Sequence, residues 1–429
     1  MPQIRDPIHG SIEMTGDEVA LIDAPWYQRL RNVMQLGFTV LAFPGGTHTR
    51  YTHGIGAMQV ASRIFDALPT QRLPPEDRAR FRQALRIAVL THDIGHAPLS
   101  HASEAIMCQR GKLGLPAWTG DEKRRANHED YTLKILLDSE FSRLIDDRFG
   151  EMGISPAAIA SLVIGKNAPG EEAAFVSGDT DWSPLLRQIV SSELDADRMD
   201  YLQRDSFYTG VSYGRFDLDW LATNLTVAER DGAAYLALAK RAIFAFEDFL
   251  LSRYHMFVSV YYHYTPICFD NMLKRYYDEA PGEYEIPADV EKYLEHDDIH
   301  LTSALRQSKN RWAQGIVRRR PWRLVAEINE FDRGYDIDAL MKALETAKVE
   351  AFQTESKGVL SKYFQKSEGP RLWVHDSGND SYTPIEEYTP LYERYSKTVR
   401  INRIYVDPDR YDAAKQAVRK VTGAKDIAL

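Results

Sequence analysis

The sequence has few cysteines and no long apolar run, and each shortage excludes a class of protein. Only Cys108 and Cys268 occur among 429 residues, which excludes a disulfide-stapled secreted scaffold and fits a reducing compartment. The first residues lack the basic segment and following apolar run of a secretory leader. No apolar stretch approaches the roughly 20 residues that a membrane-spanning helix needs. We therefore expect a cytoplasmic protein with no membrane partner.

Positive charge is also in short supply. The 53 Lys and Arg residues face 62 Asp and Glu residues, and the net charge of −9 argues against a protein that mainly coats nucleic acid. One basic run, Arg-Arg-Arg-Pro-Trp-Arg at 318–323, is the exception. A solvated surface turn is favoured there over an anion or oligonucleotide site. Nucleic-acid binding is therefore not indicated.

Apolar periodicity predicts a mainly α-helical fold with a small appendage. Helices are expected over 24–35, 51–68, 75–93, 127–138 and 183–207, and over 242–279 with a break near Pro266. Asp231-Gly232 lies between alternating segments and predicts a β-hairpin. A strand over 400–407 and a helix over 408–422 indicate an α+β unit. The predicted domains are a core over 1–335 and an appendage over 336–429 that stabilises an oligomer.

Histidine and carboxylate side chains are concentrated at the end of the predicted helix 75–93. His92, Asp93, His96 and His101 fall within ten residues, and seven of the twelve histidines precede residue 130. Imidazole with carboxylate is the ligand set of a divalent metal such as Fe, Mn, Co, Ni or Zn. The alternative is a group of hydrogen-bonded core histidines beside a helix end. The pattern favours a metal site.

Two other helices carry polar groups on one face. Asp197, Tyr201 and Asp205 stand at i, i+4 and i+8, which offers one metal ligand and two polar handles. An ordinary charged helix is the alternative. Arg253 and Tyr261 share the same spacing through Phe257, and there the alternative is a core stripe with one surface arginine. Arg50 and His53, three residues apart, also share a helix face.

Together, His53, His92-Asp93 and Asp197 resemble the H…HD…D pattern of HD-domain metal phosphohydrolases. Further matching segments are Asp-Pro-Ile-His-Gly at 6–10 and the residues at 23–31, 35–37, 43–45, 48–53 and 195–205. This set looks like the deoxynucleoside-triphosphate triphosphohydrolase branch, which includes the vertebrate SAM-and-HD-domain dNTPase and bacterial dNTPases and dGTPases. No SAM domain is recognisable before it. The resemblance implies an HD-domain helical bundle.

The resemblance also implies roles for individual residues. His53, His92, Asp93 and Asp197 would hold the divalent transition metal, and Mg²⁺ would arrive with the substrate. His101, with His96 and Glu104 behind it, would protonate the leaving oxygen, and His128 would contact phosphate. The residues implied to bind the dNTP are Gln35, Leu36, Arg50, Arg198, Tyr201, Asp205, Arg253 and Tyr261. Glu104 replaces the aspartate of the vertebrate enzyme, and Phe257 replaces its pocket histidine.

A regulatory site is implied by Asp23, Gln28 and Arg31. These residues match the guanine-reading positions of the family's activator site, so GTP or a dNTP is the expected activator. The lysine expected near residues 2–3 is missing, because Pro2 and Gln3 stand there. A helix cap with surface charges is the alternative. Family members assemble as tetramers or hexamers, so a homo-oligomer is also expected.

The expected reaction is metal-dependent hydrolysis of dNTPs to deoxynucleoside and inorganic triphosphate, by water attack on the α-phosphate. One alternative is hydrolysis of another phosphoester: a nucleoside monophosphate, a cyclic nucleotide or the end of a single-stranded nucleic acid. A di-iron oxygenase and a nucleotide-binding regulatory protein with a vestigial site are two more. Tyr201 and Asp205 favour dNTP hydrolysis over hydrolysis of another phosphoester, because they suit a deoxyribose pocket.

Overall fold

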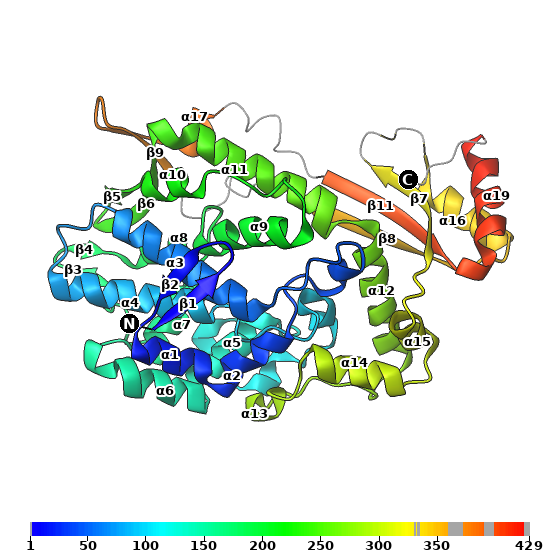
Figure 1. Cartoon of the computed structure of the whole chain (residues 1–429), viewed down its shortest axis with the longest axis horizontal. Helices are drawn as coiled ribbons and strands as arrows, with labels where there is room; N and C mark the ends of the chain where they lie inside the picture. The colour runs from blue at the N-terminus through cyan, green and yellow to red at the C-terminus, as the bar shows by residue number, and fades with distance from the viewer. Residues whose placement is uncertain (1, 330–331, 333–334, 359–371, 390–398, 424–429) are drawn as a thin grey trace.

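The computed structural model describes residues 2–329, 332, 335–358, 372–389 and 399–423 (Figure 1). Three helices form the centre of the larger part: α3 (Arg50–Ala67), α4 (Pro75–Thr91) and α9 (Ala196–Thr209). Helix α3 packs against both α4 and α9. Its apolar side chains, among them Ile64 and Phe65, are fully buried. The predicted helices 51–68 and 75–93 are thus confirmed and form the core that carries the histidines.

Further helices pack around this centre. Helix α5 (His128–Leu137) confirms the prediction over 127–138, and Ser155 caps α7 (Pro156–Ile164). Further helices before residue 320 are α1 (Gly16–Asp23), α2 (Pro25–Arg29), α6 (Glu140–Phe149), α8 (Ser183–Val190), α10 (Leu218–Thr223), α11 (Ile243–Met256), α12 (Tyr264–Glu279), α13 (Val290–Tyr293), α14 (Asp298–Gln307) and α15 (Arg311–Val317). Within the described ranges, every helix is too short or too polar to cross a bilayer.

The predicted helix over 183–207 is wrong, because the chain forms two helices, α8 and α9. The Asp195 carboxylate accepts hydrogen bonds from the backbone N–H groups of Ser192 and Arg198, both at 2.7 Å. Asp195 therefore acts as the N-cap of α9, and residues 191–195 form a turn. Helix α9 therefore begins as a separate helix after residue 195, with Asp197 in its first helical turn.

The helix predicted over 24–35 is also shorter than expected. It ends as α2 at Arg29 and continues only as a 3-10 turn over Leu30–Asn32. The following residues run extended beside residues 48–50, since the Gln35 N–H donates to the His48 carbonyl at 3.1 Å. This pairing brings the chain around Gln35 next to the start of α3.

The long aromatic stretch breaks slightly before the predicted position. Helix α11 continues as a π-helical turn over Phe257–Tyr261, and α12 begins at Tyr264. Pro266 lies in the first turn of α12, where its missing N–H leaves no hydrogen bond unmade. The π-helical turn places Phe257 and Tyr261 at the edge of the site described below.

The larger part also contains a two-stranded hairpin and a mixed sheet. The hairpin joins β1 (Gln3–Asp6) and β2 (Gly10–Glu13). The sheet contains the predicted hairpin around Asp231-Gly232, formed by β5 (Leu225–Arg230) and β6 (Ala233–Ala239). Strand β9 (Trp373–Asp376) pairs parallel with β6. The remaining strands of this sheet are β3 (Val176–Ser177), β4 (Thr180–Asp181) and β10 (Ser381–Pro384), and α17 (Ile385–Tyr388) follows β10.

The α+β appendage forms one end of the molecule (Figure 1). Its sheet has the order β7 (Arg323–Asn329), β11 (Val399–Val406), β8 (Ala351–Gly358). Helices α16 (Ile337–Thr346) and α19 (Tyr411–Thr422) share a separate hydrophobic core with it. The mainly α fold with a small α+β appendage is confirmed. The predicted boundary at 335 differs from this arrangement, since β7 precedes it and β9–β10 return to the main sheet.

The basic run forms a turn after α15, as expected. Arg318, Arg319 and Arg320 are exposed, and Trp322 packs against Trp312 with ring centroids 4.7 Å apart. The aromatic residue of the run therefore belongs to the packing of the chain.

A buried ion pair ties α1 to α4. Arg86 donates to both Glu18 carboxylate oxygens at 2.5 and 2.7 Å, and the two residues are 4% and 0% exposed. The Thr15–Glu18 capping box holds the same carboxylate at the start of α1. We predict that Glu18→Ala lowers the free energy of unfolding by about 3–5 kcal/mol, because it leaves Arg86 buried without its partner.

Urea denaturation measures this change. Asp17→Ala is the control, since Asp17 makes an exposed ion pair with Arg148 at 3.4 Å and its loss should cost less than about 1 kcal/mol. Equal losses for the two variants would contradict the prediction.

Candidate metal centre and substrate cavity

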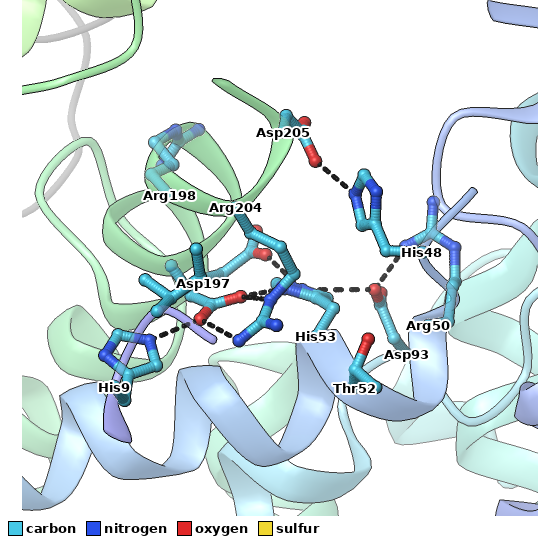
Figure 2. A network of polar contacts seen from close by, with 12 residues as sticks. His9, His48, Arg50, Thr52, His53, Asp93, Asp197, Arg198, Arg204 and Asp205 are labelled. Carbon is cyan, nitrogen blue, oxygen red and sulfur yellow. Dashed lines mark hydrogen bonds and ion pairs between the residues drawn. The ribbon is translucent and has the colours of Figure 1, made fainter. Parts of the chain in front are cut away.

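Four side chains from three central helices meet at one point. His53 lies in the first turn of α3, His92 and Asp93 follow the last residue of α4, and Asp197 lies in the first turn of α9. Figure 2 shows His53 between Asp197 and Asp93. The structure therefore brings together the four residues predicted to hold a metal.

The distances among these groups fit one ion. His53 Nε2 lies 2.9 Å from an Asp197 oxygen and 3.6 Å from an Asp93 oxygen. His92 Nε2 lies 3.4 and 3.5 Å from oxygens of the same two carboxylates. Ligands bound at about 2.1 Å from a common metal are separated by roughly 3–3.4 Å. Both Nε2 atoms are buried and close to these carboxylates, so an ion held by the four groups would take the place of a proton.

Hydrogen bonds on the far side of each imidazole fix its orientation. His92 Nδ1 donates to the Val89 carbonyl at 2.7 Å, and His53 Nδ1 donates to Asp200 at 2.8 Å. Such contacts leave the Nε2 lone pair for the metal and fix the ring. Arg50 makes a close ion pair with Asp93. His53, His92 and Asp93 are thus held in position by other residues, as expected of a pre-formed metal site.

The charges of the site shift the pKa values of its ligands. Burial alone lowers the pKa of His53, but hydrogen bonds to Asp197 and Asp200 outweigh it and raise the pKa to about 10. Burial likewise opposes protonation of His92, while the charges of Asp93 and Asp197 raise its pKa to about 9. Burial raises the pKa of Asp197, but hydrogen bonds from the two imidazoles hold it well below its ordinary value. A metal ion would therefore displace protons on binding.

A second group of possible metal ligands adjoins the first. It consists of His96, His101, Glu104 and His128, whose ligand atoms lie within 4.8 Å of one another. His96 Nε2 lies 3.2 Å from Asp93, and its ring stacks on His128 with centroids 3.9 Å apart. Glu104 accepts from His101 Nδ1 at 3.1 Å and makes a close contact with His128. All four residues predicted to handle protons or contact phosphate are thus neighbours.

Exposure separates the roles that these histidines can take. The His101 side chain is 67% exposed, so its ring can reach a bound molecule. His96 is buried, and burial together with Arg50 and His128 holds its pKa well below the ordinary value. His96 is therefore neutral. Of the three rings, His101 is the one suited to exchange a proton with a substrate and solvent.

A cavity of about 480 Å³ opens beside these groups, a size typical of small-molecule sites. Asp93, Asp197, His96, His101 and His128 line one part of it. Six of the eight predicted substrate contacts also line it: Gln35, Leu36, Arg50, Tyr201, Asp205 and Tyr261. The face Asp197–Tyr201–Asp205 of α9 therefore points into the same cavity as the histidine cluster.

A polar group suited to a sugar hydroxyl lies on the α9 wall. Asp205 accepts from the Tyr261 hydroxyl at 2.7 Å and from His48 Nε2 at 2.7 Å. These bonds hold the carboxylate in one orientation, and Tyr201 lies one helical turn nearer to Asp197. The arrangement offers a hydrogen-bond acceptor and a bulky phenol at a fixed spacing from the metal ligands.

The two remaining predicted contacts, Arg198 and Arg253, lie outside the cavity lining. Arg253 pairs with the buried carboxylate of Glu193 at 3.3 Å. Arg198 pairs with Asp195 at 2.7 Å and lies 3.8 Å from Glu193. Arg50 is the sole arginine or lysine among the described residues that line the cavity.

The predicted activator residues gather on the surface, outside the cavity. Arg31 donates to Gln28 at 2.7 Å and lies over the Tyr51 ring at 3.7 Å from its centroid. Asp23 is exposed at the end of α1. The three residues are thus close together at the junction of α1, α2 and α3.

Two loops that line the cavity are held by a residue from beyond the HD-type motifs. Asp298, at the start of α14, accepts from the Leu99 N–H at 2.6 Å and from the Met34 N–H at 3.0 Å. Leu99 and Ser100 both adopt positive φ angles, a strained conformation for residues with side chains. Asp298 therefore fixes the chain on either side of the cavity mouth.

Several groups of the site were not predicted from the sequence. Asp270 and Phe38 line the cavity, and burial raises the pKa of the Asp270 carboxyl to about 7. Asp200, His9 and Arg204 lie behind His53. Asp200 and His9 do occur in the segments 195–205 and 6–10 that carry the resemblance. Their presence in these two segments was the one indication in the sequence that they lie near the site.

Comparisons with known proteins place these motifs in a family. Residues 50–205 match the profile of the HD domain, and residues 216–348 match the profile of the HD associated region. The first match contains the four metal-ligand candidates and the neighbouring histidines. The second contains Phe257, Tyr261, Asp270 and Asp298, so both matched regions contribute to the site.

Curated relatives support the same grouping. An uncharacterized protein of Methanocaldococcus jannaschii is 31% identical over 332 residues, 77% of this chain and 61% of that protein. The deoxynucleoside triphosphate triphosphohydrolase SAMHD1 homolog of Dictyostelium discoideum is 34% identical over 214 residues, 49% of this chain and 37% of that protein. The human deoxynucleoside triphosphate triphosphohydrolase SAMHD1 is 26% identical over 292 residues, 67% of this chain and 46% of that protein. The matches thus span less than two thirds of each relative.

Solved structures share the fold over nearly the whole chain. A hypothetical protein from Aquifex aeolicus superposes with a TM-score of 0.75 at 24% identity, covering 97% of this chain and 99% of that one. A phosphohydrolase from Bacteroides thetaiotaomicron superposes with a TM-score of 0.68 at 22% identity, covering 95% and 99%. At these identities the likeness concerns the fold alone.

We predict that His92→Ala removes bound metal from the protein, because it deletes one of four ligands. Metal content after dialysis, measured by mass spectrometry, should fall from about one ion per chain to near zero. His300→Ala is the control, since that histidine lies on α14 outside the cavity lining. Unchanged metal content in His92→Ala would contradict the ligand assignment.

The raised pKa values of His53 and His92 predict how stability depends on pH. Both folded-state values, about 10 and about 9, exceed the ordinary 6.5. In metal-free protein, their contribution to stability is complete below pH 6.5 and is lost as the pH rises through 9 to 10. We expect the melting temperature in EDTA to fall over this range, and His92→Ala to reduce that fall. A fall of the same size in wild type and variant would contradict the assignment.

Proposed function

The chain belongs to the HD-domain family, and from this premise we propose that it is a metal-dependent phosphohydrolase acting on deoxynucleoside triphosphates. The products are the deoxynucleoside and inorganic triphosphate. One observation carries the proposal: the α9 face with Asp197, Tyr201 and Asp205 shares a cavity with the histidine cluster. A group suited to a sugar hydroxyl and groups suited to phosphate hydrolysis thus face the same bound molecule.

The metal ligands are His53, His92, Asp93 and Asp197. When bound there, a divalent ion lowers the pKa of a coordinated water and supplies the nucleophile for phosphorus. Fe, Mn, Co, Ni and Zn all suit imidazole with carboxylate, and Mg²⁺ suits the phosphate oxygens of the substrate. Asp93 also pairs with Arg50, which holds this carboxylate in place on the side of the cavity.

The remaining residues orient the substrate and handle the proton. Water oxygen forms a bond to the α-phosphorus, and the bond from that phosphorus to the 5′-oxygen breaks. His101 donates a proton to the leaving 5′-oxygen, and Glu104 holds the His101 ring at 3.1 Å. Asp205 accepts from the sugar 3′-hydroxyl, and the Tyr201 ring occupies the space that a 2′-hydroxyl would need.

A second candidate function is favoured by the scarcity of cations in the cavity. Arg50 is paired with Asp93, while Arg198 and Arg253 are engaged by Asp195 and Glu193. A triphosphate would then depend on metal ions and protonated histidines for charge compensation. A nucleoside monophosphate needs less compensation and is the alternative substrate.

A product assay tests the proposal. We predict that the protein with Mn²⁺, Fe²⁺ or Mg²⁺ converts dNTPs to deoxynucleoside and intact triphosphate, detected by ion-exchange chromatography and mass spectrometry. In water enriched in heavy oxygen, the label should enter the triphosphate, because attack occurs at phosphorus. Ribonucleotides should react more slowly, owing to Tyr201. Reactions with and without GTP test the activator.

The controls separate the two candidate functions. His92→Ala should be inactive on every substrate, which excludes a contaminating phosphatase. Cleavage of deoxynucleoside monophosphates alone would favour the second candidate. Release of pyrophosphate or orthophosphate from dNTPs would contradict the proposed bond cleavage.

A further inference from the structure

The N-terminal hairpin reaches the metal centre through its turn. Asp6 Oδ1 accepts hydrogen bonds from the backbone N–H groups of Ile8 and His9, both at 2.9 Å. This arrangement closes the turn between β1 and β2 and fixes where His9 leaves the backbone. The His9 side chain is 1% exposed, although it belongs to a two-stranded hairpin at the chain start. Figure 2 shows it beside His53, on the side away from Asp93.

The Asp200 carboxylate connects the hairpin to His53. It accepts from His9 Nε2 at 2.6 Å and from His53 Nδ1 at 2.8 Å. Arg204 donates to the same carboxylate at 2.8 and 2.9 Å, and its remaining nitrogen donates to Asp6 Oδ2 at 2.8 Å. Within the hairpin, His9 therefore contacts Asp200 and Asp6 contacts Arg204.

The network has no room to rearrange. Asp200, Arg204 and His53 are 0% exposed. A Cβ atom at Gly56 of α3 would lie 2.1 Å from both an Asp200 oxygen and an Arg204 nitrogen, so the backbone of α3 presses directly on the pair. Burying so many ionisable groups costs more than an apolar packing of the same volume would. The network is thus better explained by the fixed positions that it gives to side chains than by a contribution to the stability of the fold.

Rotation of the His53 ring is the geometric quantity that this network controls. The ring has one nitrogen on Asp200 and the other directed at Asp197 and Asp93. Asp200 can move only if His9 or Arg204 moves, and Asp6 holds Arg204. A change in the hairpin would therefore turn the Nε2 atom of His53 away from the metal position.

We propose that His9 and Asp6 are positioning residues of the metal centre: through Asp200 and Arg204, they fix the His53 ring so that its Nε2 faces the ion. The inference rests on the metal site of the proposed function. It makes the hairpin Gln3–Glu13, which precedes the HD-domain match, part of the site. A purely structural hairpin would affect folding but not metal affinity at a given stability.

Metal binding by the whole chain tests the inference. We expect His9→Ala to weaken Mn²⁺ binding, measured by calorimetry, by about tenfold or more, as for other losses of a group that orients a ligand. His9→Gln should restore most of the affinity, because its amide can donate to Asp200. In the Co²⁺-loaded protein, His9→Ala should also shift the visible absorption bands, which report ligand geometry.

A matched variant controls for folding. Ile12 lies in the same hairpin with its side chain 0% exposed and takes no part in the network, so Ile12→Val should lower the melting temperature without changing Mn²⁺ affinity. Wild-type affinity in His9→Ala, or an equal loss in Ile12→Val, would overturn the inference. If wild type binds metal but cleaves no dNTP, the substrate proposal fails and the inference stands. If wild type binds no metal, both fail.

Discussion

The carboxylate of Asp200 is the point where the fold and the metal centre are joined. It lies on α9, receives hydrogen bonds from the hairpin and α3, and shares an ion pair with Arg204 one helical turn away. Because α3 and α9 pack closely at Gly56, the position of the carboxylate sets the separation of the helices that carry His53 and Asp197. The geometry of the candidate ligands is therefore a consequence of helix packing, and the pairing of charges offsets only part of the cost of burying them.

Charge is distributed unevenly around the cavity. Carboxylates of Asp93, Asp197 and Asp205 line it, against the guanidinium of Arg50. Such a lining attracts cations before it attracts anions. A phosphorylated substrate is then best accommodated together with its metal ions. The order in which metal and substrate bind therefore affects the reaction.

The sequence predicted which candidate ligands lie together better than it predicted their surroundings. His92-Asp93 and the α9 face could be identified because their spacing is local and survives any error in helix boundaries. Asp195 could not be identified as a helix cap, since the residues before it continue an apolar pattern that also suits a helix. The engagement of Arg198 and Arg253 by acidic groups depends on how α9 and α11 meet, which spacing along the chain does not encode. Asp200 lies three residues from Asp197 and contacts the other nitrogen of the His53 ring, but its contact with His9 depends on how the hairpin packs, which spacing along the chain does not encode.

The hydrogen bonds from Leu99 and Met34 to Asp298 limit how such a chain can be divided into fragments. The HD-domain match ends at residue 205, so it contains the histidine cluster but not Asp298, which holds the loop at Leu99 in a strained conformation. A fragment that ends there would keep every metal ligand and yet lose one wall of the cavity. The HD segment is thus not a portable module: exchanging it between relatives would require its downstream region to travel with it.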